Sequence, residues 1–378
     1  MVIAILGLGT IGSGVLEIAQ RHPDITVKKV LEVRFKTELT TDNMEDITSD
    51  PEIELVVETM GGLHPAYEFA SAAIAAGKHF VTANKLLVSA YGRELTALAR
   101  EKNVAFLYDA ACGGGIAYLE NMKIAHGIDE LVALGGIMNG TTNFILDSMQ
   151  SEGMDYDVAL KKAQELGYAE RNPSADVDGL DTQRKLILSC AVAFDSFMKA
   201  EDIHTCGISS VKFADCEYAK KRGFALRLCA SAEKQENGFS AYVEPAMVTG
   251  DMAESAIKKN VNYVWYQGKC YGLMGYIGQG AGKLPTGANV VRDVLSIMDG
   301  ERYMTTDALR DAKPDNTAAK HSYYVRLPKG ETLPEGWAAR AESDGTYTYF
   351  ETNDVSVADM HARFAGRGDA FFAGIRKA

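Results

Sequence analysis

The sequence lacks the long apolar runs and the excess of basic charge that mark several large classes of protein. No run of about 18 apolar residues occurs, so no transmembrane helix is expected. Acidic residues outnumber basic ones, 51 to 39, and the net charge is −12. This balance argues against nucleic acid and anionic membranes as partners.

Cysteines are few and scattered. Six occur, no two form a C-x-x-C pair, and none has the His/Cys spacing of a zinc site. A chain of 378 residues needs no disulfide framework, so a reducing cytoplasm is the expected location. The apolar N-terminus, MVIAILGLGTIGSG, imitates a signal peptide, yet it has no basic residues before its apolar stretch. Its regularly spaced glycines favour a buried strand and a turn.

The first 110 residues alternate between short apolar runs and helical patterns, which is typical of a parallel, doubly wound α/β sheet. The runs predict strands at Val2–Leu6, Val27–Val33, Leu55–Thr59, His79–Ala83 and Val104–Asp109. Helices are expected between them, at Ser13–Gln20, His64–Ala76 and Glu94–Lys102.

The pattern changes near residue 130. A strand at 131–138, helices at 142–149, 155–166 and 181–194, and only short strands between 204 and 277 predict an α+β domain. A glycine-rich loop, 278–287, precedes a helix at 288–298. We therefore expect a Rossmann dinucleotide-binding domain over 1–130, rejoined by the helix at about 280–300. A substrate-binding domain follows over 131–279, and then a C-terminal extension over 301–378.

The turn after the first expected strand reads Gly7-Leu8-Gly9-Thr10-Ile11-Gly12, which matches G-x-G-x-x-G between a strand and a helix. In that context the glycines permit a tight turn, close approach of a pyrophosphate and close helix–strand packing. Glu32 stands where an acidic residue holds a ribose 2′-hydroxyl, but Arg34 and Lys36 beside it could neutralise a 2′-phosphate. The sequence leaves the choice between NAD and NADP open.

A second candidate site lies in the acidic segment 167–181 and the helix that follows it. Asp181 and Lys185 are four residues apart, so they share one helix face. The rest of that helix is apolar nearly all round, which favours a buried functional pair over a surface ion pair. Asp176-Val-Asp-Gly179 is not a calcium loop, because its glycine comes too early and Ile187 stands where the glutamate should be. Lys85 follows a strand at its carboxyl end, where such sheets bind ligands, although an exposed turn lysine would look the same.

Several blocks of the sequence, in order, resemble the homoserine dehydrogenase family over residues 1 to about 300. They are the glycine turn, VVETMGG (56–62), AGKHFVTANK (76–85), DAACGGGIA (109–117), GGIMNGTTNFIL (135–146), GYAERNPSADVDGLDTQRK (167–185) and GQGAGKLPTGANVVRDV (278–294). The resemblance implies reversible NAD(P)H-dependent reduction of L-aspartate 4-semialdehyde to L-homoserine, on the route to threonine, methionine and isoleucine.

The resemblance also implies roles for individual residues. Lys185 matches the proton donor or acceptor, and Lys85 matches a second lysine beside the nicotinamide and the substrate. The implied substrate-binding residues are Asn139, Gly140, Thr141, Glu170, Asp176 and Asp181. The implied cofactor-binding residues are Gly7, Gly9, Thr10, Ile11, Gly12, Glu32, Arg34, Thr82, Lys85 and Gly282.

The family often binds a monovalent cation, sodium or potassium, through one acidic side chain and three backbone carbonyls. The matching positions are Asp109, Cys112, Gly114 and Ile116. This sequence departs from that pattern, because Asp109 is shorter than the usual glutamate and Ala117 replaces the usual proline. The cation site therefore stays open.

The resemblance further suggests a homodimer that forms through the 131–279 domain, which makes it a substrate-binding and dimerisation domain. It also suggests a C-terminal extension that is a reduced regulatory ACT-like remnant. Two alternative functions are kept. One is a related Rossmann oxidoreductase that acts on another small oxo or hydroxy acid, and the other is a nucleotide-binding regulatory protein without catalysis.

Overall fold

The computed structural model describes residues 1–377, and the chain divides into two compact units. The first unit contains Met1–Glu130, Ile187–Lys199 and Gly278–Ala312, and the second contains Leu131–Leu186, Ala200–Ile277 and the described residues from Lys313 onward. The expected extension, 301–378, is thus divided between the two units, and its last residue, Ala378, lies outside the described residues.

A six-stranded parallel sheet forms the centre of the first unit, with the strand order β3-β2-β1-β4-β5-β6. This is the order of a Rossmann fold, so the predicted fold class is confirmed. The strands are β1 (Val2–Leu6), β2 (Thr26–Leu31), β3 (Thr40–Thr41), β4 (Leu55–Glu58), β5 (His79–Thr82) and β6 (Phe106–Leu107). All residues of β4 are buried, as expected for a parallel strand covered on both faces.

Helices connect these strands: α1 (Thr10–Ala19), α2 (Glu45–Thr48), α3 (Ala66–Ala75), α4 (Lys85–Glu101) and α5 (Tyr118–His126), with α12 (Lys283–Met298) joining from later in the chain. A 3-10 turn covers Asp109–Ala111, and β8 (Ser196–Phe197) pairs with β14 (Arg310–Asp311). The expectation of a helix beginning at Glu94 was wrong. The Asn84 side chain accepts a hydrogen bond from Leu87 N and caps α4 nine residues earlier.

A ten-stranded mixed sheet dominates the second unit, in the order β13-β12-β7-β10-β11-β20-β16-β18-β17, with β9 paired to β11. Its strands are β7 (Leu131–Ile137), β9 (His204–Thr205), β10 (Phe224–Gln235), β11 (Gly238–Thr249), β12 (Val261–Gly268), β13 (Gly272–Gln279), β16 (Tyr323–Pro328), β17 (Ala338–Ser343), β18 (Tyr347–Thr352) and β20 (Phe371–Arg376). A separate pair joins β15 (Lys320–His321) and β19 (Val355–Ser356).

The expectation of only short strands between 204 and 277 was wrong, because β10 and β11 have 12 residues each. Pro245 lies in the middle of β11, and proline usually interrupts a strand because it has no N–H for the hydrogen bonds of a sheet. In the structure Pro245 pairs with Leu228 on one side. On the other side it falls between β9, which pairs at Tyr242 and Val243, and β20, which pairs from Ala246. The proline is therefore tolerated where the neighbouring strand changes.

The helices of the second unit are α6 (Gly140–Glu152), α7 (Tyr156–Glu165), α8 (Ser174–Val177), α10 (Phe213–Lys221), α11 (Ala253–Ala256) and α13 (Val357–Phe364), with a 3-10 turn at Ala200–Asp202. Helix α9 (Leu180–Ala193) begins in the second unit and ends in the first. No helix in the described part of the chain is long and apolar enough to cross a membrane.

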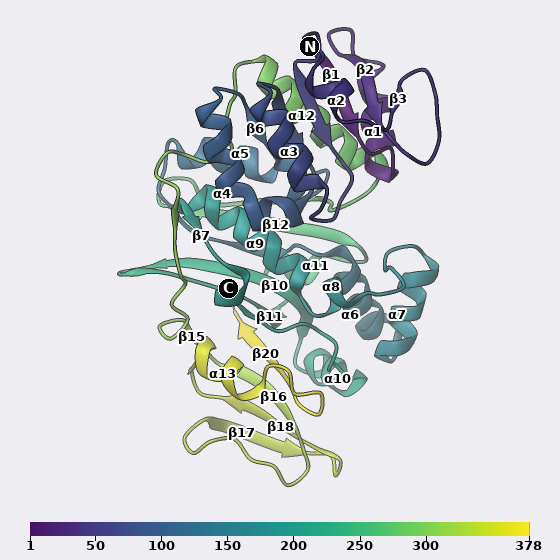
Figure 1. Cartoon of the computed structure of the whole chain (residues 1–378). Coiled ribbons are helices and arrows are strands. Elements are labelled where there is room, and N and C mark those ends of the chain that lie inside the picture. The colour runs from purple at the N-terminus through teal and green to yellow at the C-terminus, as the bar shows by residue number, and fades with distance from the viewer. Residues whose placement is uncertain (378) are drawn as a thin grey trace. The chain divides into compact units, whose positions relative to one another are not determined.

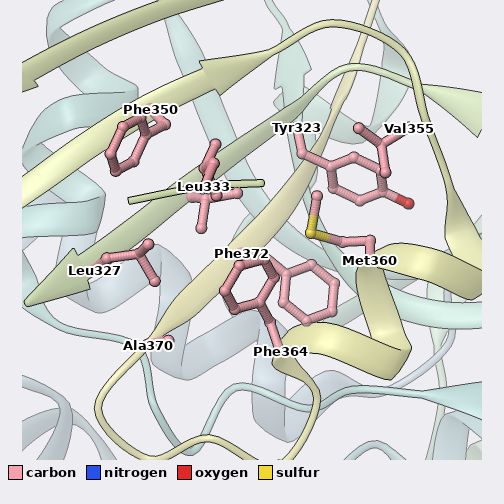
Figure 2. Packing of buried hydrophobic residues seen from close by; sticks show 10 residues of the cluster. Tyr323, Leu327, Leu333, Phe350, Val355, Met360, Phe364, Ala370 and Phe372 are labelled. Atoms are coloured by element: carbon pink, nitrogen blue, oxygen red, sulfur yellow. The ribbon is translucent and has the colours of Figure 1, made fainter. Parts of the chain in front are cut away.

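The end of the chain has its own apolar core within the second unit. Strands β16, β17, β18 and β20 lie side by side with α13 near them, in yellow-green and yellow (Figure 1). Figure 2 shows Tyr323, Phe350, Met360, Phe364 and Phe372 packed together between these elements. A β-α-β-β-α-β module would have a helix between its first two strands, whereas residues 329–337 form turns and irregular chain. A reduced regulatory module stays a prediction.

Candidate active site

The glycine turn of the first unit has the geometry of a phosphate-binding loop. Gly7 adopts φ +86°, and a Cβ on Gly12 would lie 2.0 Å from Gly7 O. Gly9 precedes α1, and a Cβ there would meet nothing within 4 Å. Thr10 and Ile11 are the first residues of α1, so the N–H groups of its first turn adjoin open space beside Gly9.

Helix α12 packs closely against α1 in the same unit. A Cβ on Gly14 would lie 2.1 Å from Lys283 O, and one on Gly287 would lie 2.8 Å from Gly14 C. Gly282, with φ +131°, immediately precedes α12. The start of α12, which was expected only at Ala288, is therefore next to Gly14 in the first half of α1.

Glu32 and Arg34 form a bidentate pair just after β2. Arg34 Nε and Nη2 donate to the Glu32 carboxylate at 2.8 and 2.5 Å, and Leu8 N in the glycine turn donates to it at 3.1 Å. Hydrogen bonding from Arg34 outweighs burial and lowers the pKa of Glu32 to about 2. The carboxylate thus stays ionised, and the two side chains point the same way.

A buried relay fixes the turn between β5 and α4. Thr82 Oγ1 donates to Glu58 at 2.5 Å and accepts from Asn84 N at 2.9 Å. The Asn84 side chain donates to Gly62 O at 2.7 Å while it caps α4. Lys85 is the first residue of α4 and is half-buried, so it is not an exposed turn lysine. Glu58 lies in the VVETMGG motif, and the sequence pattern does not single it out as a site residue. Its desolvation raises its pKa, and this burial is visible only once β4 is placed inside the sheet.

The Asp109–Ile116 loop is tightly held within the first unit. Leu119 N and Glu120 N donate to Asp109 Oδ1 at 2.7 and 3.2 Å, and Asp109 N donates to Asp293 Oδ2 at 2.9 Å. Burial raises the pKa of Asp109 to about 7, against the opposing effect of those two amides and of the Asn289 side chain. Burial also raises the pKa of Asp293.

The residues expected to hold a monovalent cation do not fit one as they stand. The Asn289 side-chain nitrogen donates to Gly114 O at 2.9 Å and to Ile116 O at 3.3 Å, so a protein donor already binds two of the expected carbonyl ligands. Cys112 is buried with its Sγ 3.7 Å from Ser189 Oγ. Within residues 1–377 no cluster of three or more histidine, cysteine or acidic side chains could hold a metal ion.

In the second unit, Lys185 is buried and bound to two acceptors. Its Nζ donates to Asp181 Oδ2 at 2.8 Å and to Met138 O at 2.6 Å. Lys185 and Asp181 are 6% and 5% exposed, which confirms the predicted burial and the shared helix face. Buried charges of opposite sign that share hydrogen bonds are costly to separate, so this pair is well fixed.

Asn139 joins this pair to Asp176. Its Nδ2 donates to Asp176 Oδ1 at 2.7 Å and to Asp181 Oδ2 at 2.8 Å, while its Oδ1 accepts from Thr142 N and caps α6. Asn262, which sequence reasoning missed, donates to Met138 O at 2.9 Å, the carbonyl that also accepts from Lys185. We name the group formed by Asn139, Asp176, Asp181 and Lys185 the lysine cluster.

The other expected substrate residues lie around the start of α6 and the α7–α8 loop. A Cβ on Gly140 would lie 2.6 Å from Asn260 O, so this position requires glycine. Thr141 Oγ1 donates to Tyr168 O at 2.5 Å and ties α6 to that loop. Glu170 is exposed, and within residues 1–377 its carboxylate forms no hydrogen bond or ion pair. The structure therefore does not bring Glu170 into the lysine cluster.

The parallel sheet, the glycine turn and the acidic residue after β2 define an NAD(P)-dependent oxidoreductase. Comparison with known proteins identifies the family. The family model described as homoserine dehydrogenase, NAD binding domain, matches residues 7–109, and the one described as homoserine dehydrogenase matches residues 118–295.

Whole-chain relatives agree with these matches. A homoserine dehydrogenase of Synechocystis is 38% identical over 350 residues, which cover 88% of this chain and 80% of the relative. One of Bacillus subtilis is 35% identical and covers 80% of this chain and 74% of its own length. The crystal structure of a homoserine dehydrogenase from Thiobacillus denitrificans superposes with a TM-score of 0.87 at 30% identity, over 100% of this chain and 98% of the other. The chain belongs to the homoserine dehydrogenase family.

Proposed function

We propose that this chain catalyses the reversible NAD(P)H-dependent reduction of L-aspartate 4-semialdehyde to L-homoserine, with Lys185 as the proton donor and acceptor. The observation that carries the proposal is the buried Lys185 ammonium, which is bound both to Asp181 and to the Met138 carbonyl. A general acid must be fixed within reach of the oxygen that it protonates. A product of this kind would serve the synthesis of threonine, methionine and isoleucine.

The first unit is proposed to hold the cofactor. Gly7, Gly9, Thr10, Ile11 and Gly12 would bind the pyrophosphate, and Glu32 and Arg34 the adenosine ribose. Thr82, Lys85 and Gly282 would lie nearer the nicotinamide. The open space beside Gly9 and the first turn of α1 fit a pyrophosphate. When bound, the nicotinamide supplies the hydride for aldehyde reduction and accepts it in the reverse direction.

Lys185 can provide the proton transfer that must accompany the hydride transfer. As hydride adds to the aldehyde carbon, its oxygen gains negative charge, which an ammonium stabilises. Lys185 Nζ then transfers a proton to that oxygen to give the hydroxyl, and solvent returns the proton to the amine. In the oxidation of homoserine the amine accepts the hydroxyl proton. Asp181 positions Lys185 directly, and Asn139 positions Asp181. Both residues would also line the substrate site.

The substrate also carries an ammonium and a carboxylate. We propose that Glu170 and Asp176 bind the ammonium, because charge-assisted hydrogen bonds are about twice as strong as neutral ones. Asn139, Gly140 and Thr141 would line the same site, with Lys85 as a second lysine beside the substrate. The exposed Glu170 carboxylate has no competing partner within residues 1–377.

A substrate panel tests this assignment. Oxidation of L-homoserine is compared with that of 4-hydroxybutyrate, which lacks only the amino group, and with that of other small hydroxy acids. We expect kcat/KM to be highest for L-homoserine and to fall by about a hundredfold or more without the ammonium. Equal use of 4-hydroxybutyrate would contradict the roles of Glu170 and Asp176, and a better hydroxy acid would replace homoserine as the substrate.

We also propose a homodimer that forms through the second unit and works in the cytoplasm. Strand β13 is the first strand of the ten-stranded sheet, and its Leu273 and Ile277 are 61% and 64% exposed. Exposed apolar side chains on an edge strand favour pairing with a second copy. The six cysteines are all free, which suits a reducing compartment.

A further inference from the structure

The Asn289 side chain lies where the family resemblance places a monovalent cation. It projects from α12, is 1% exposed, and donates from one nitrogen to both Gly114 O and Ile116 O. The Asn289 side chain also acts to lower the pKa of Asp109, against the larger effect of burial. Two carbonyls expected to bind a cation are therefore bound by the nitrogen of a neutral amide.

The chemistry of these groups fixes the orientation of the amide. A carboxamide nitrogen carries two N–H donors, and a carbonyl oxygen is only an acceptor. Gly114 O and Ile116 O can therefore hydrogen-bond to Asn289 only through its nitrogen. The two N–H groups present the carbonyls with partial positive charge, which is what a sodium or potassium ion would supply. A cation at this place would have to displace the amide.

Other contacts within the protein also hold the Asp109–Ile116 loop in place. Gly115 N donates to Gln279 O at 3.0 Å. A Cβ on Gly114 would lie 2.3 Å from Gly280 O, so the two glycine-rich segments are in direct backbone contact. Together with the bonds to Asp109 Oδ1, these contacts connect the loop at several points without an ion.

Two further buried acceptors must be considered for the alternative, which is a cation bound at this place. Asp109 Oδ2 and Asn289 Oδ1 have no hydrogen-bond partner within residues 1–377. A cation stripped of water needs several oxygens around it, and these two atoms alone do not supply them while the amide nitrogen binds the carbonyls. Rotation of the Asn289 amide would be required before the expected carbonyls could bind an ion.

We infer that the Asn289 side-chain amide replaces the monovalent cation in this chain, so that the Asp109–Ile116 loop is ordered without sodium or potassium. The inference does not depend on the substrate, since its main readout is thermal stability rather than turnover.

The test compares melting temperatures in choline, sodium and potassium chloride at equal ionic strength. For the unsubstituted protein we expect the same melting temperature in all three salts. Asn289→Ala removes the donor and exposes the carbonyls, and Asn289→Asp replaces the donor with an anionic ligand of the same size. Both variants should melt earlier in choline and regain stability with a saturable dependence on sodium or potassium, because a ligand that binds only the folded state stabilises it. Arg292→Ala, at a half-exposed position on the same helix, is the control and should show no cation dependence.

The inference is overturned if the unsubstituted protein gains stability saturably from sodium or potassium but not from choline. It is also overturned if both Asn289 variants melt as the unsubstituted protein does, whatever the salt. If neither variant folds in any salt, crystals of the unsubstituted protein soaked in rubidium decide the question. Anomalous density beside Asp109 would contradict the inference, and its absence at high rubidium concentration would support it.

Discussion

Lys185 Nζ lies 2.8 Å from Asp181 Oδ2, one helical turn away, and both side chains are buried. The carboxylate balances an ammonium that would otherwise be costly to bury. The Asn139 amide binds the same carboxylate oxygen and restricts its position. The pair therefore holds the Lys185 side chain, the proposed proton donor, in a fixed position.

Lys185→Ala should reduce kcat for L-homoserine oxidation by about 100- to 10,000-fold, the usual contribution of a general acid–base group. Nucleotide affinity should persist, because the glycine turn lies in the other unit. Stopped-flow or steady-state absorbance gives kcat, and quenching of protein fluorescence by NADH or NADPH gives the affinity. Lys161→Ala, at an exposed position on α7, is the matched control and should leave both unchanged. Undiminished kcat would remove Lys185 from its proposed role.

The proposed role of Asn139 in catalysis should depend more on its Nδ2 donor than on the Oδ1 that caps α6. Asn139→Asp keeps an acceptor for Thr142 N but adds a third carboxylate beside Asp176 and Asp181, to which it cannot donate when ionised. We expect Asn139→Asp to lower kcat by at least about tenfold and to lower the melting temperature, since an unsatisfied buried polar group costs about 1–3 kcal/mol.

Ser356→Ala serves as the control for Asn139, because it removes a helix cap from α13 in which Ser356 bonds to Asp359 and not to the lysine cluster. It should cost about 1 kcal/mol of stability and leave kcat unchanged. If Asn139→Asp behaves like this control, the amide bonds to Asp176 and Asp181 have no part in catalysis.

Arg34 should distinguish the two cofactors. Its side chain is 61% exposed and pairs with Glu32, which is proposed to bind the ribose. Arg34→Ala should weaken NADPH binding by roughly tenfold or more, the value of one charge-assisted hydrogen bond, and should affect NADH less. Glu32→Gln should have the opposite bias, since it removes a negative charge that repels a 2′-phosphate. Equal losses for NADH and NADPH in a fluorescence titration of Arg34→Ala would show that Arg34 does not contact the phosphate.

Glu244, a buried carboxylate, should make the stability of the second unit sensitive to acid. Glu244 accepts hydrogen bonds from His321 and His361 at 2.9 and 3.0 Å. Burial alone would raise the pKa of Glu244, but the two histidines hold it at about 2, below the ordinary 4.5. A lowered carboxylate pKa stabilises the fold above pH 4.5, and this stabilisation is lost as the pH falls toward 2.

Glu244→Gln should therefore destabilise the protein at pH 7 by about 3–5 kcal/mol, the cost of breaking a buried pair. Its melting temperature should approach that of the unsubstituted protein as the pH falls from 4.5 toward 2. Glu233→Gln, at an exposed position on β10, is the control and should show neither effect. A difference from the unsubstituted protein that is independent of pH would contradict the assigned source of stability.

Local patterns predicted much of the fold, and long-range contacts account for what they missed. The glycine turn and the spacing of Asp181 and Lys185 depend on neighbours within a few residues, so both can be predicted from the sequence alone. The bonds from Asn139 to Asp176 and Asp181 and from Asn262 to Met138 join residues far apart in the chain. Only the packing of α6, α9 and β12 brings them together.

Asn289 shows the same limit. It lies in the glycine-rich motif at 278–294, but nothing in the neighbouring sequence indicates that its amide binds the carbonyls of Gly114 and Ile116. The start of α4 and the length of β11 were missed for a different reason. Gly92 weakens the helical pattern and Pro245 interrupts the strand pattern, and tertiary contacts override both.

The most direct test of the account is absorbance at the nicotinamide band when the purified protein meets L-homoserine with NAD or NADP, in choline chloride and then with added sodium or potassium chloride. We predict that at least one cofactor is reduced by the unsubstituted protein and not measurably by Lys185→Ala. Absence of reduction with both cofactors in every salt, by protein that still binds nucleotide, would contradict the proposed reaction.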